Sequence, residues 1–149
     1  MQTQLVDSIR NTPEGQEAEA ILRSCVHCGF CTATCPTYQL LSDELDGPRG
    51  RIYLIKQMLE GKDVSENTLE HLDRCLLCRS CETTCPSGVQ YGRLLDYGRD
   101  LAEKASPRCA VDKLKRRAIL SVVPHAGRFG PLLKLGQLVR PVMPAAIRA

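Results

Sequence analysis

Residues 25–36 read CVHCGFCTATCP, and residues 75–86 read CLLCRSCETTCP. Each run spaces its four cysteines as C-x2-C-x2-C-x3-C and ends in a proline, and each cysteine recurs 50 positions later. A doubled run of this kind is typical of ferredoxins that hold two cubane iron-sulfur clusters, in which the fourth cysteine of each run binds the other cluster. The pattern therefore predicts two metal sites, each with ligands from both runs.

The crossing of the fourth cysteines fixes the expected ligand sets. We expect one [4Fe-4S] cluster on Cys25, Cys28, Cys31 and Cys85, and another on Cys75, Cys78, Cys81 and Cys35. Two residues between cysteines let the backbone curl around one corner of a cubane, so that three thiolates reach three irons. A fourth thiolate from the same short loop cannot reach the last iron, and the proline after it redirects the chain.

Other uses of these cysteines fit the spacing less well. Structural zinc sites usually take separated C-x2-C pairs, in which a third cysteine three residues on has no place. Disulfides between cysteines three residues apart have poor geometry, and a redox C-x-x-C site does not need four cysteines twice. The spacing favours iron-sulfur clusters over all three.

Length and composition predict one modest domain. The chain has 149 residues with two Phe, four Tyr and no Trp, so we expect the clusters to supply much of the folding free energy. The sequence has no apolar run long enough to span a membrane, and residues 1–11 lack the features of a signal peptide. We expect the chain to work in the cytoplasm, either free or at the cytoplasmic face of the inner membrane.

Charge divides the chain into two parts. Residues 1–103 carry ten Lys and Arg against sixteen Asp and Glu, whereas residues 104–149 carry ten against the single Asp112. We expect a helical two-cluster ferredoxin domain at 1–104 and a basic, proline-interrupted segment at 105–149. The basic segment could serve an acidic partner or an anionic membrane, although a solvated charged face is the commoner explanation.

Apolar spacing and capping residues predict helices and no hairpin. One helix should begin with Thr12 as its N-cap and lead into Cys25, and another should run from Pro48 to Gly61. A third, capped by Ser65 or Asn67, should lead into Cys75, and residues 89–104 should form a helix that closes over the clusters. The stretch between the runs lacks alternating β-branched residues, which favours a mainly α ferredoxin over the βαβ type.

The basic segment shows weaker helical signals. Val111, Leu114, Ala118 and Val122 share one helical face. Prolines 124, 131, 141 and 144 interrupt the rest, so that only Leu132 to Val139 is expected to form a further short amphipathic helix.

A few polar residues stand out beside the runs. Arg49 and Arg51 lie in the first turn of the predicted 48–61 helix, where a cation opposes the helix dipole, so an anion should be near. That anion could be a cluster or an acidic partner, or both arginines could be solvated. His27 could tune a cluster or lie in solvent, and Cys109 is expected to be a free thiol. No catalytic motif is present, and we expect no catalytic residue and no nucleic-acid partner.

The sequence closely resembles the iron-sulfur subunits of bacterial glycolate oxidase in three stretches, which are residues 25–38, ELDGPRGRI at 44–52, and the second motif from HLDRC at 71–75 to CPSGV at 85–89. The resemblance is specific through residue 104 and rests on scattered positions beyond it. It implies a helical ferredoxin domain similar to those of succinate dehydrogenase and anaerobic glycerol-3-phosphate dehydrogenase, working beside partner subunits that bind FAD. Family members continue into cysteine-rich repeats, and this sequence ends at Ala149 before them, so we expect a fragment or a shortened homologue.

Together these features predict an electron-transfer subunit of a flavin-dependent glycolate oxidase. By resemblance, FAD on the partner subunits would oxidise glycolate to glyoxylate, and the clusters would pass the electrons singly to a membrane acceptor. The same module could instead serve a lactate, glycerol-3-phosphate or heterodisulfide flavoprotein. A structural zinc adaptor is the alternative from another functional class.

Overall fold

The computed structural model describes residues 1–139, apart from the side chains of Glu66 and Val139. The chain divides into two compact units, the first from Met1 to Pro107 and the second from Arg108 onward. Both cysteine runs lie in the first unit.

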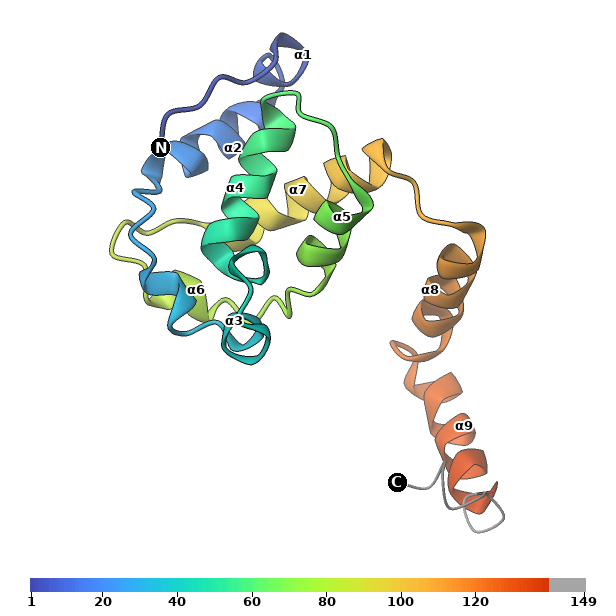
Figure 1. Ribbon diagram of the computed structural model, residues 1–149. Helices are drawn as coiled ribbons and strands as arrows, with labels where there is room; N and C mark the ends of the chain where they lie inside the picture. The colour runs from blue at the N-terminus through green and yellow to red at the C-terminus, as the bar shows by residue number, and fades with distance from the viewer. Residues whose placement is uncertain (140–149) are drawn as a thin grey trace. The chain divides into compact units, whose positions relative to one another are not determined.

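Short helices joined by tight loops build the first unit (Figure 1). In chain order they are α1 (Asp7–Arg10), α2 (Pro13–Ser24), η1 (Phe30–Thr32), α3 (Pro36–Leu41), η2 (Glu44–Asp46), α4 (Pro48–Leu59), α5 (Glu66–Asp73), α6 (Ser80–Thr83) and α7 (Tyr91–Ala105). No strand occurs within residues 1–139, which confirms the mainly α prediction.

The apolar core lies between the four longer helices. α7 packs against α4, α5 and α2, and Figure 1 shows α4 and α7 crossing in the middle of the unit. The apolar side chains with no exposed surface there are Leu22, Ile55, Leu59, Leu72, Leu94, Leu95 and Ala102. A Cβ atom on Gly98 would lie 2.6 Å from Ile55 Cγ1, so α7 approaches α4 at a point where only glycine fits.

The predicted helix ends are confirmed by their hydrogen bonds. The Thr12 hydroxyl accepts from the Gly15 amide at 3.1 Å, and the Ser65 hydroxyl accepts from the Thr68 amide at 3.2 Å. Gly61 has a φ of +83° and ends α4 with a paired turn in which the Gly61 and Lys62 amides bond to carbonyls within the helix. The helices that precede the two cysteine runs are α2, which ends at Ser24, and α5, which ends at Asp73.

The second unit contains α8 (Ala110–Val122) and α9 (Ala126–Val139) among its described residues. α8 confirms the helix predicted from the spacing of Val111 to Val122. The prediction of a helix limited to Leu132–Val139 is wrong, because α9 starts six residues earlier and includes Pro131. Pro131 lacks the amide that would bond to the Gly127 carbonyl, so the helix runs through this position with one hydrogen bond fewer. Pro141 and Pro144 lie outside the described residues.

Both helices of the second unit expose apolar side chains beside basic ones. The apolar residues include Leu114, Leu120, Leu132 and Leu138, each at least half exposed. Within residues 1–139, no helix is both long and apolar enough to cross a membrane.

Candidate metal centres

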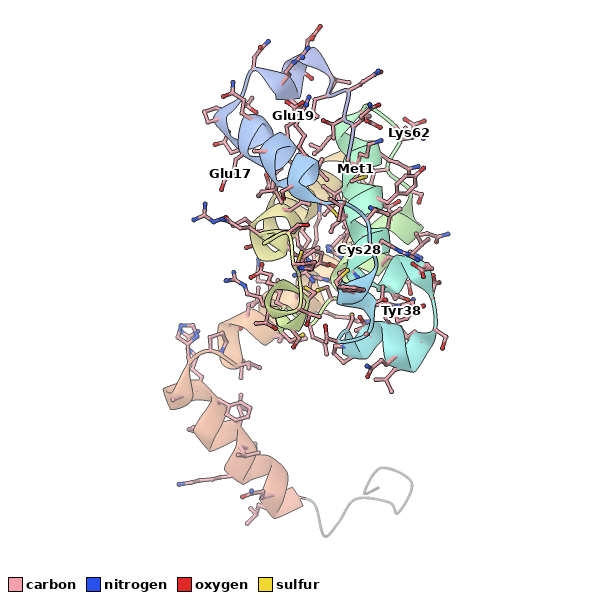
Figure 2. The ribbon with its side chains drawn as sticks, turned by 90° about the vertical axis from the view of Figure 1, so that its left-hand side faces the viewer. Met1, Glu17, Glu19, Cys28, Tyr38 and Lys62 are labelled. Carbon is pink, nitrogen blue, oxygen red and sulfur yellow. The ribbon has the colours of Figure 1, made fainter. Side chains whose placement is uncertain are left out.

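The first cysteine loop directly follows the C-terminal end of α2. Cys25 caps that helix and donates its amide to the Leu22 carbonyl at 3.2 Å, and Figure 2 shows Cys28 in the loop that follows. His27 and Gly29 adopt left-handed backbone conformations with φ of 61° and 86°. These two reversals and the short helix η1 turn the loop around a cavity.

The second loop follows the same backbone path after α5. Leu77 and Arg79 have φ of 54° and 57°, at the positions that correspond to His27 and Gly29 fifty residues earlier. Left-handed conformations are uncommon for residues other than glycine and are typical of functional sites. The repeat is therefore a repeat of backbone geometry as well as of cysteines.

Each loop encloses a cavity that the other run completes. The first cavity has about 450 Å³ of empty space, and its cysteines are Cys25, Cys28, Cys31, Cys81 and Cys85. The second has about 300 Å³, and its cysteines are Cys35, Cys75, Cys78 and Cys81. Cys85 thus reaches the first cavity from the second run, and Cys35 reaches the second cavity from the first run.

Contacts between equivalent threonines join the two runs. The Thr84 hydroxyl donates to the Thr34 hydroxyl at 3.3 Å, and these residues are also 50 positions apart. Thr34 and Thr84 both lie within reach of the Ser80 carbonyl, at 3.3 and 3.1 Å. The pairing holds η1 against α6 and brings the fourth cysteine of each run near the opposite loop.

The thiols differ in burial and therefore in acidity. All nine cysteines are free of disulfides, and Cys25, Cys35 and Cys81 are buried. Burial raises the pKa of the Cys31 thiol, and burial also raises the pKa of Cys81 to about 12. The Ser80 amide and hydroxyl lower the pKa of exposed Cys78. Buried thiols of this kind ionise when a metal cation replaces the proton, so the donor set fits a thiolate-bound metal cluster.

Tyr91, the first residue of α7, stands between the two cavities. Its side chain lines both of them, together with Pro48 and Cys81. The hydroxyl donates to Cys75 Sγ at 3.6 Å, and burial raises the pKa of Tyr91 well above its ordinary value. Tyr91 is therefore a neutral donor at this wall, and it begins the helix that was predicted to cover the sites.

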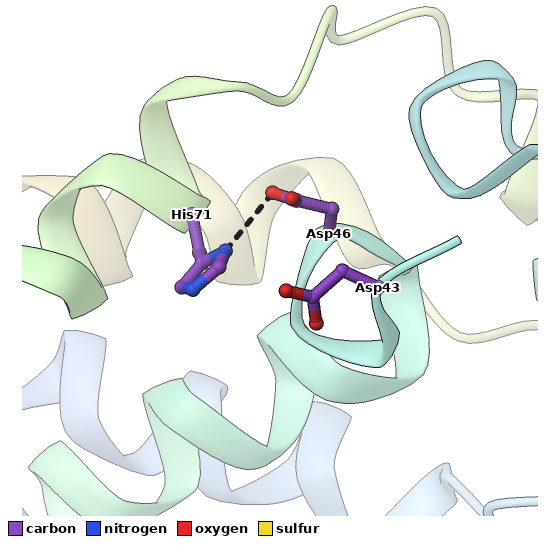
Figure 3. Close-up of side chains that lie close together, drawn as sticks. All are labelled: Asp43, Asp46 and His71. Atoms are coloured by element: carbon purple, nitrogen blue, oxygen red, sulfur yellow. Dashed lines mark hydrogen bonds and ion pairs between the residues drawn. The ribbon is translucent and has the colours of Figure 1, made fainter. Parts of the chain in front are cut away.

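A buried polar network lies behind the second cavity. The Arg51 side chain is fully buried and donates to the His71 carbonyl at 2.7 Å, the Thr37 hydroxyl at 3.1 Å and the Asp46 carboxylate at 3.4 Å. His71 contacts the Asp46 carboxylate at 3.0 Å (Figure 3), and Arg74 donates to the same carboxylate at 3.0 Å. Burial alone would raise the pKa of Asp46, but the bonds from His71 and Arg74 outweigh it, and the pKa is lowered.

This network decides between the alternatives for Arg51. An anion lies near it, as predicted, since Asp46 of the same chain contacts the guanidinium, and Arg51 also lines the second cavity. The side chain is fully buried, so the solvated and partner-binding alternatives are wrong for this residue. Arg49 points to the surface, where it pairs with Glu44 at 2.7 Å, and it also lines the first cavity. The helical spacing of residues in the sequence cannot reveal the Arg51–Asp46 pair, because Asp46 lies outside α4, in the preceding turn η2.

Asp43, Asp46 and His71 could in principle share a cation, since one ligand atom of each lies within 4.8 Å of the others (Figure 3). Asp46 is already bonded to Arg51, Arg74 and His71, and Asp43 caps η2 by accepting from the Leu45 amide at 2.9 Å. These partners make the group part of the structural network.

Sequence reasoning gave no functional role to Thr37, Ser80, Tyr91, Asp46 or His71. Thr37 Oγ1 lies 3.2 Å from Cys35 Sγ, so it touches a predicted ligand directly. A comparison of the two runs position by position would have found Ser80, because Phe30 occupies the equivalent place. Cys109 is exposed, lies at the start of α8 and forms no disulfide.

Residues 21–89 match the family described as "4Fe-4S dicluster domain". These residues are a 4Fe-4S dicluster domain. The match spans both cysteine runs, and it favours two iron-sulfur clusters over the zinc alternative. The dicluster domain lies within the first unit of the structure.

Two bacterial proteins that this chain matches carry the name of the family that the sequence resembles. The chain is 58% identical over all of its 149 residues to the "Glycolate oxidase iron-sulfur subunit" of Escherichia coli (strain K12), and spans 37% of that protein. It is 35% identical over 144 residues to the "Probable glycolate oxidase iron-sulfur subunit" of Bacillus subtilis (strain 168), which is 94% of this chain and 32% of that protein.

A more distant relative is succinate dehydrogenase [ubiquinone] iron-sulfur subunit 3, mitochondrial, of Arabidopsis thaliana. The identity is 24% over 120 residues, which is 75% of this chain and 34% of that protein. The chain therefore spans about a third of the length of the curated relatives it matches. These matches confirm the resemblance that the cysteine runs and their flanking residues predicted.

Proposed function

We propose that each cavity holds one [4Fe-4S] cluster and that the ligand sets cross between the runs. The first set is Cys25, Cys28, Cys31 and Cys85, and the second is Cys75, Cys78, Cys81 and Cys35. The cavity linings support this proposal, because each set lines one cavity in full. Cys81 lines both cavities, and its place in the second set follows from its spacing after Cys78.

The domain would act as an electron relay. The observation that carries this proposal is the pair of thiol-lined cavities that share a wall of Pro48, Cys81 and Tyr91. Cubane clusters accept and release single electrons, and the protein sets their potentials through burial and hydrogen bonds. Two such centres separated by one layer of side chains form a short path through the first unit.

The relatives' names suggest where the electrons come from. We propose that this chain is the cluster-binding part of a glycolate oxidase iron-sulfur subunit, and that it receives electrons from partner subunits that bind FAD. The flavin would take two electrons from glycolate, giving glyoxylate, and pass them one at a time into the clusters and on to a membrane acceptor. This chain would contribute no group that binds or deprotonates the substrate.

Spectroscopy on the anaerobically reconstituted chain tests both levels of the proposal. Iron and sulfide analysis and EPR should show two clusters, and glycolate alone should leave them oxidised. Glycolate should bleach their visible absorption once the FAD-binding subunits are added. If lactate or glycerol 3-phosphate with its own flavoprotein reduces the clusters and glycolate does not, the relay stands and the substrate assignment falls. If dithionite reduces the clusters and no flavoprotein does, the relay itself is contradicted.

The second unit supports a further proposal about location. Its described residues expose apolar side chains beside Lys113, Lys115, Arg116 and Arg117, which suits an anionic membrane at the cytoplasmic face. The full chain should bind vesicles that contain anionic lipid, and the binding should weaken as salt rises. Replacing these four residues with Gln should abolish the binding. Salt-independent binding, or no binding by either form, would favour a solvated charged face.

A further inference from the structure

The two cysteine loops share a backbone path but differ in the side chains that face their sulfurs. The clearest difference is at one position of the repeat, where the first loop has Phe30 and the second has Ser80. Phe30 is largely exposed and has no polar atom to offer. The Ser80 amide and hydroxyl lower the pKa of the Cys78 thiol.

Hydroxyl groups face three of the four sulfurs of the second set. Besides the Ser80 hydroxyl at Cys78, the Thr37 hydroxyl lies 3.2 Å from Cys35 Sγ and the Tyr91 hydroxyl lies 3.6 Å from Cys75 Sγ. Thr37 and Tyr91 are buried, with 9% and 4% of their surfaces exposed. Water competes little for these two hydroxyls.

The first cavity offers its sulfurs a different environment. Its lining includes the apolar Val26, Phe30, Ile52 and Val89 and also Ser87 and Tyr91, but the Tyr91 hydroxyl bonds to Cys75 of the second set. The His27 imidazole lies near one sulfur of this set, with its Nδ1 4.0 Å from Cys25 Sγ. Arg49 lines the cavity, but its charge is balanced by Glu44 at the surface.

Arg51 acts on the second cavity through Thr37. Asp46 balances its charge, as Glu44 balances that of Arg49, but Arg51 lines the second cavity and donates to the Thr37 hydroxyl oxygen at 3.1 Å, which orients that hydroxyl. The single Thr37 proton has two acceptors in reach, the Asp46 carbonyl at 2.7 Å and the Cys35 sulfur at 3.2 Å. A cysteine bound to iron is a thiolate that only accepts, so loading the site gives this proton an anionic partner.

Reduction adds one negative charge to a cluster, and donors aimed at its sulfurs stabilise that charge. We propose that Thr37, Ser80 and Tyr91 hold the cluster of the second cavity at a more positive reduction potential than the cluster of the first cavity. The second cavity is then the accepting end of the pair, and electrons enter through the first. This inference rests on the ligand sets proposed above.

A redox titration of the reconstituted full chain, followed by EPR, tests the inference. Cys78→Ser replaces one sulfur ligand and assigns the second cluster's signal. In the unaltered chain the second cluster should be reduced first. Thr37→Val, Ser80→Ala and Tyr91→Phe should each lower its reduced-to-oxidised ratio at a given potential by roughly fivefold, the scale of one hydrogen bond, and leave the first cluster unchanged. A tenfold loss would be a shift of 59 mV for a one-electron couple.

Two matched variants separate tuning from damage. Thr37→Ser keeps the hydroxyl and should keep the potential, whereas Phe30→Ser adds a hydroxyl to the first loop and should raise the potential of the first cluster alone. Iron analysis must find two clusters in each variant; fewer in the unaltered chain would contradict the ligand sets themselves. If both clusters assemble and the first has the higher potential, or if the hydroxyl-free variants shift neither, the proposed asymmetry is wrong.

Discussion

Replacing Arg51 with Met should destabilise the first unit far more than replacing Arg49 with Met. The two arginines lie two residues apart in the first turn of α4, so the substitutions have the same chemistry in the same helix. Arg51 is fully buried with three acceptors, and Arg49 is about one-third exposed with the Glu44 carboxylate as its partner. The comparison therefore isolates burial.

The expected magnitudes follow from these environments. Removing one partner of a buried ion pair usually costs about 3–5 kcal/mol, because the other charge stays buried without compensation. Asp46 keeps His71 and Arg74, so we expect the lower end, about 3 kcal/mol, for Arg51→Met. An exposed pair such as Arg49 and Glu44 contributes about 0–1 kcal/mol. The loss of stability for Arg51→Lys should lie between those for Arg49→Met and Arg51→Met, since lysine keeps the charge and loses the planar set of donors.

Anaerobic urea unfolding of the cluster-loaded chain, followed by circular dichroism, measures these differences. With a slope of about 1–3 kcal/mol per molar urea, Arg51→Met should move the midpoint down by about 1–3 M, and Arg49→Met by much less. Iron analysis before unfolding checks that both variants carry two clusters. Equal midpoints for the two Met variants would refute the view that the buried network stabilises this unit.

Three further outcomes are expected. Cys35→Ser should damage the cluster of the second cavity and spare the first, as resolved by EPR; loss of the first signal alone would overturn the crossed sets. Removing iron anaerobically should abolish most helical circular dichroism of the first unit, so an apo form that melts sharply would count against clusters as folding partners. The lowered pKa of Asp46 means that its ionised form stabilises the fold fully above pH 3.8 and less as pH falls through the folded-state pKa. The stability gap between the unaltered chain and Asp46→Asn should therefore narrow in acid, and a widening gap would contradict this sign.

Local signals in the sequence predicted most of the helices correctly. Thr12 and Ser65 cap their helices through hydrogen bonds to residues three positions on, and Gly61 ends α4 within the same turn. Such interactions span a few residues, so a one-dimensional reading can find them. The start of α9 differs from the prediction because Pro131 lies inside the helix and does not begin or end it.

Long-range contacts account for what the sequence did not reveal. Arg51 meets the His71 carbonyl 20 residues away, and Arg74 meets Asp46 across 28 residues. Both contacts depend on α5 packing beside η2, which no local pattern encodes. The cysteine runs are the exception, because a known ligand geometry links positions 50 residues apart before any fold is seen.

The repeat also explains why the direction of electron transfer between the two clusters must be set by side chains. Two copies of one loop with matching backbone angles would give two equivalent clusters, and electrons would have no preferred end. The copies differ where hydroxyls reach sulfur: Ser80 replaces Phe30 within the loop, and Tyr91 adds a donor from α7 after the second run. Ser80 is not needed to build a thiol-lined cavity, since the first run builds one with Phe30 at the equivalent position. The use of its hydroxyl is therefore best sought in the difference between the two potentials.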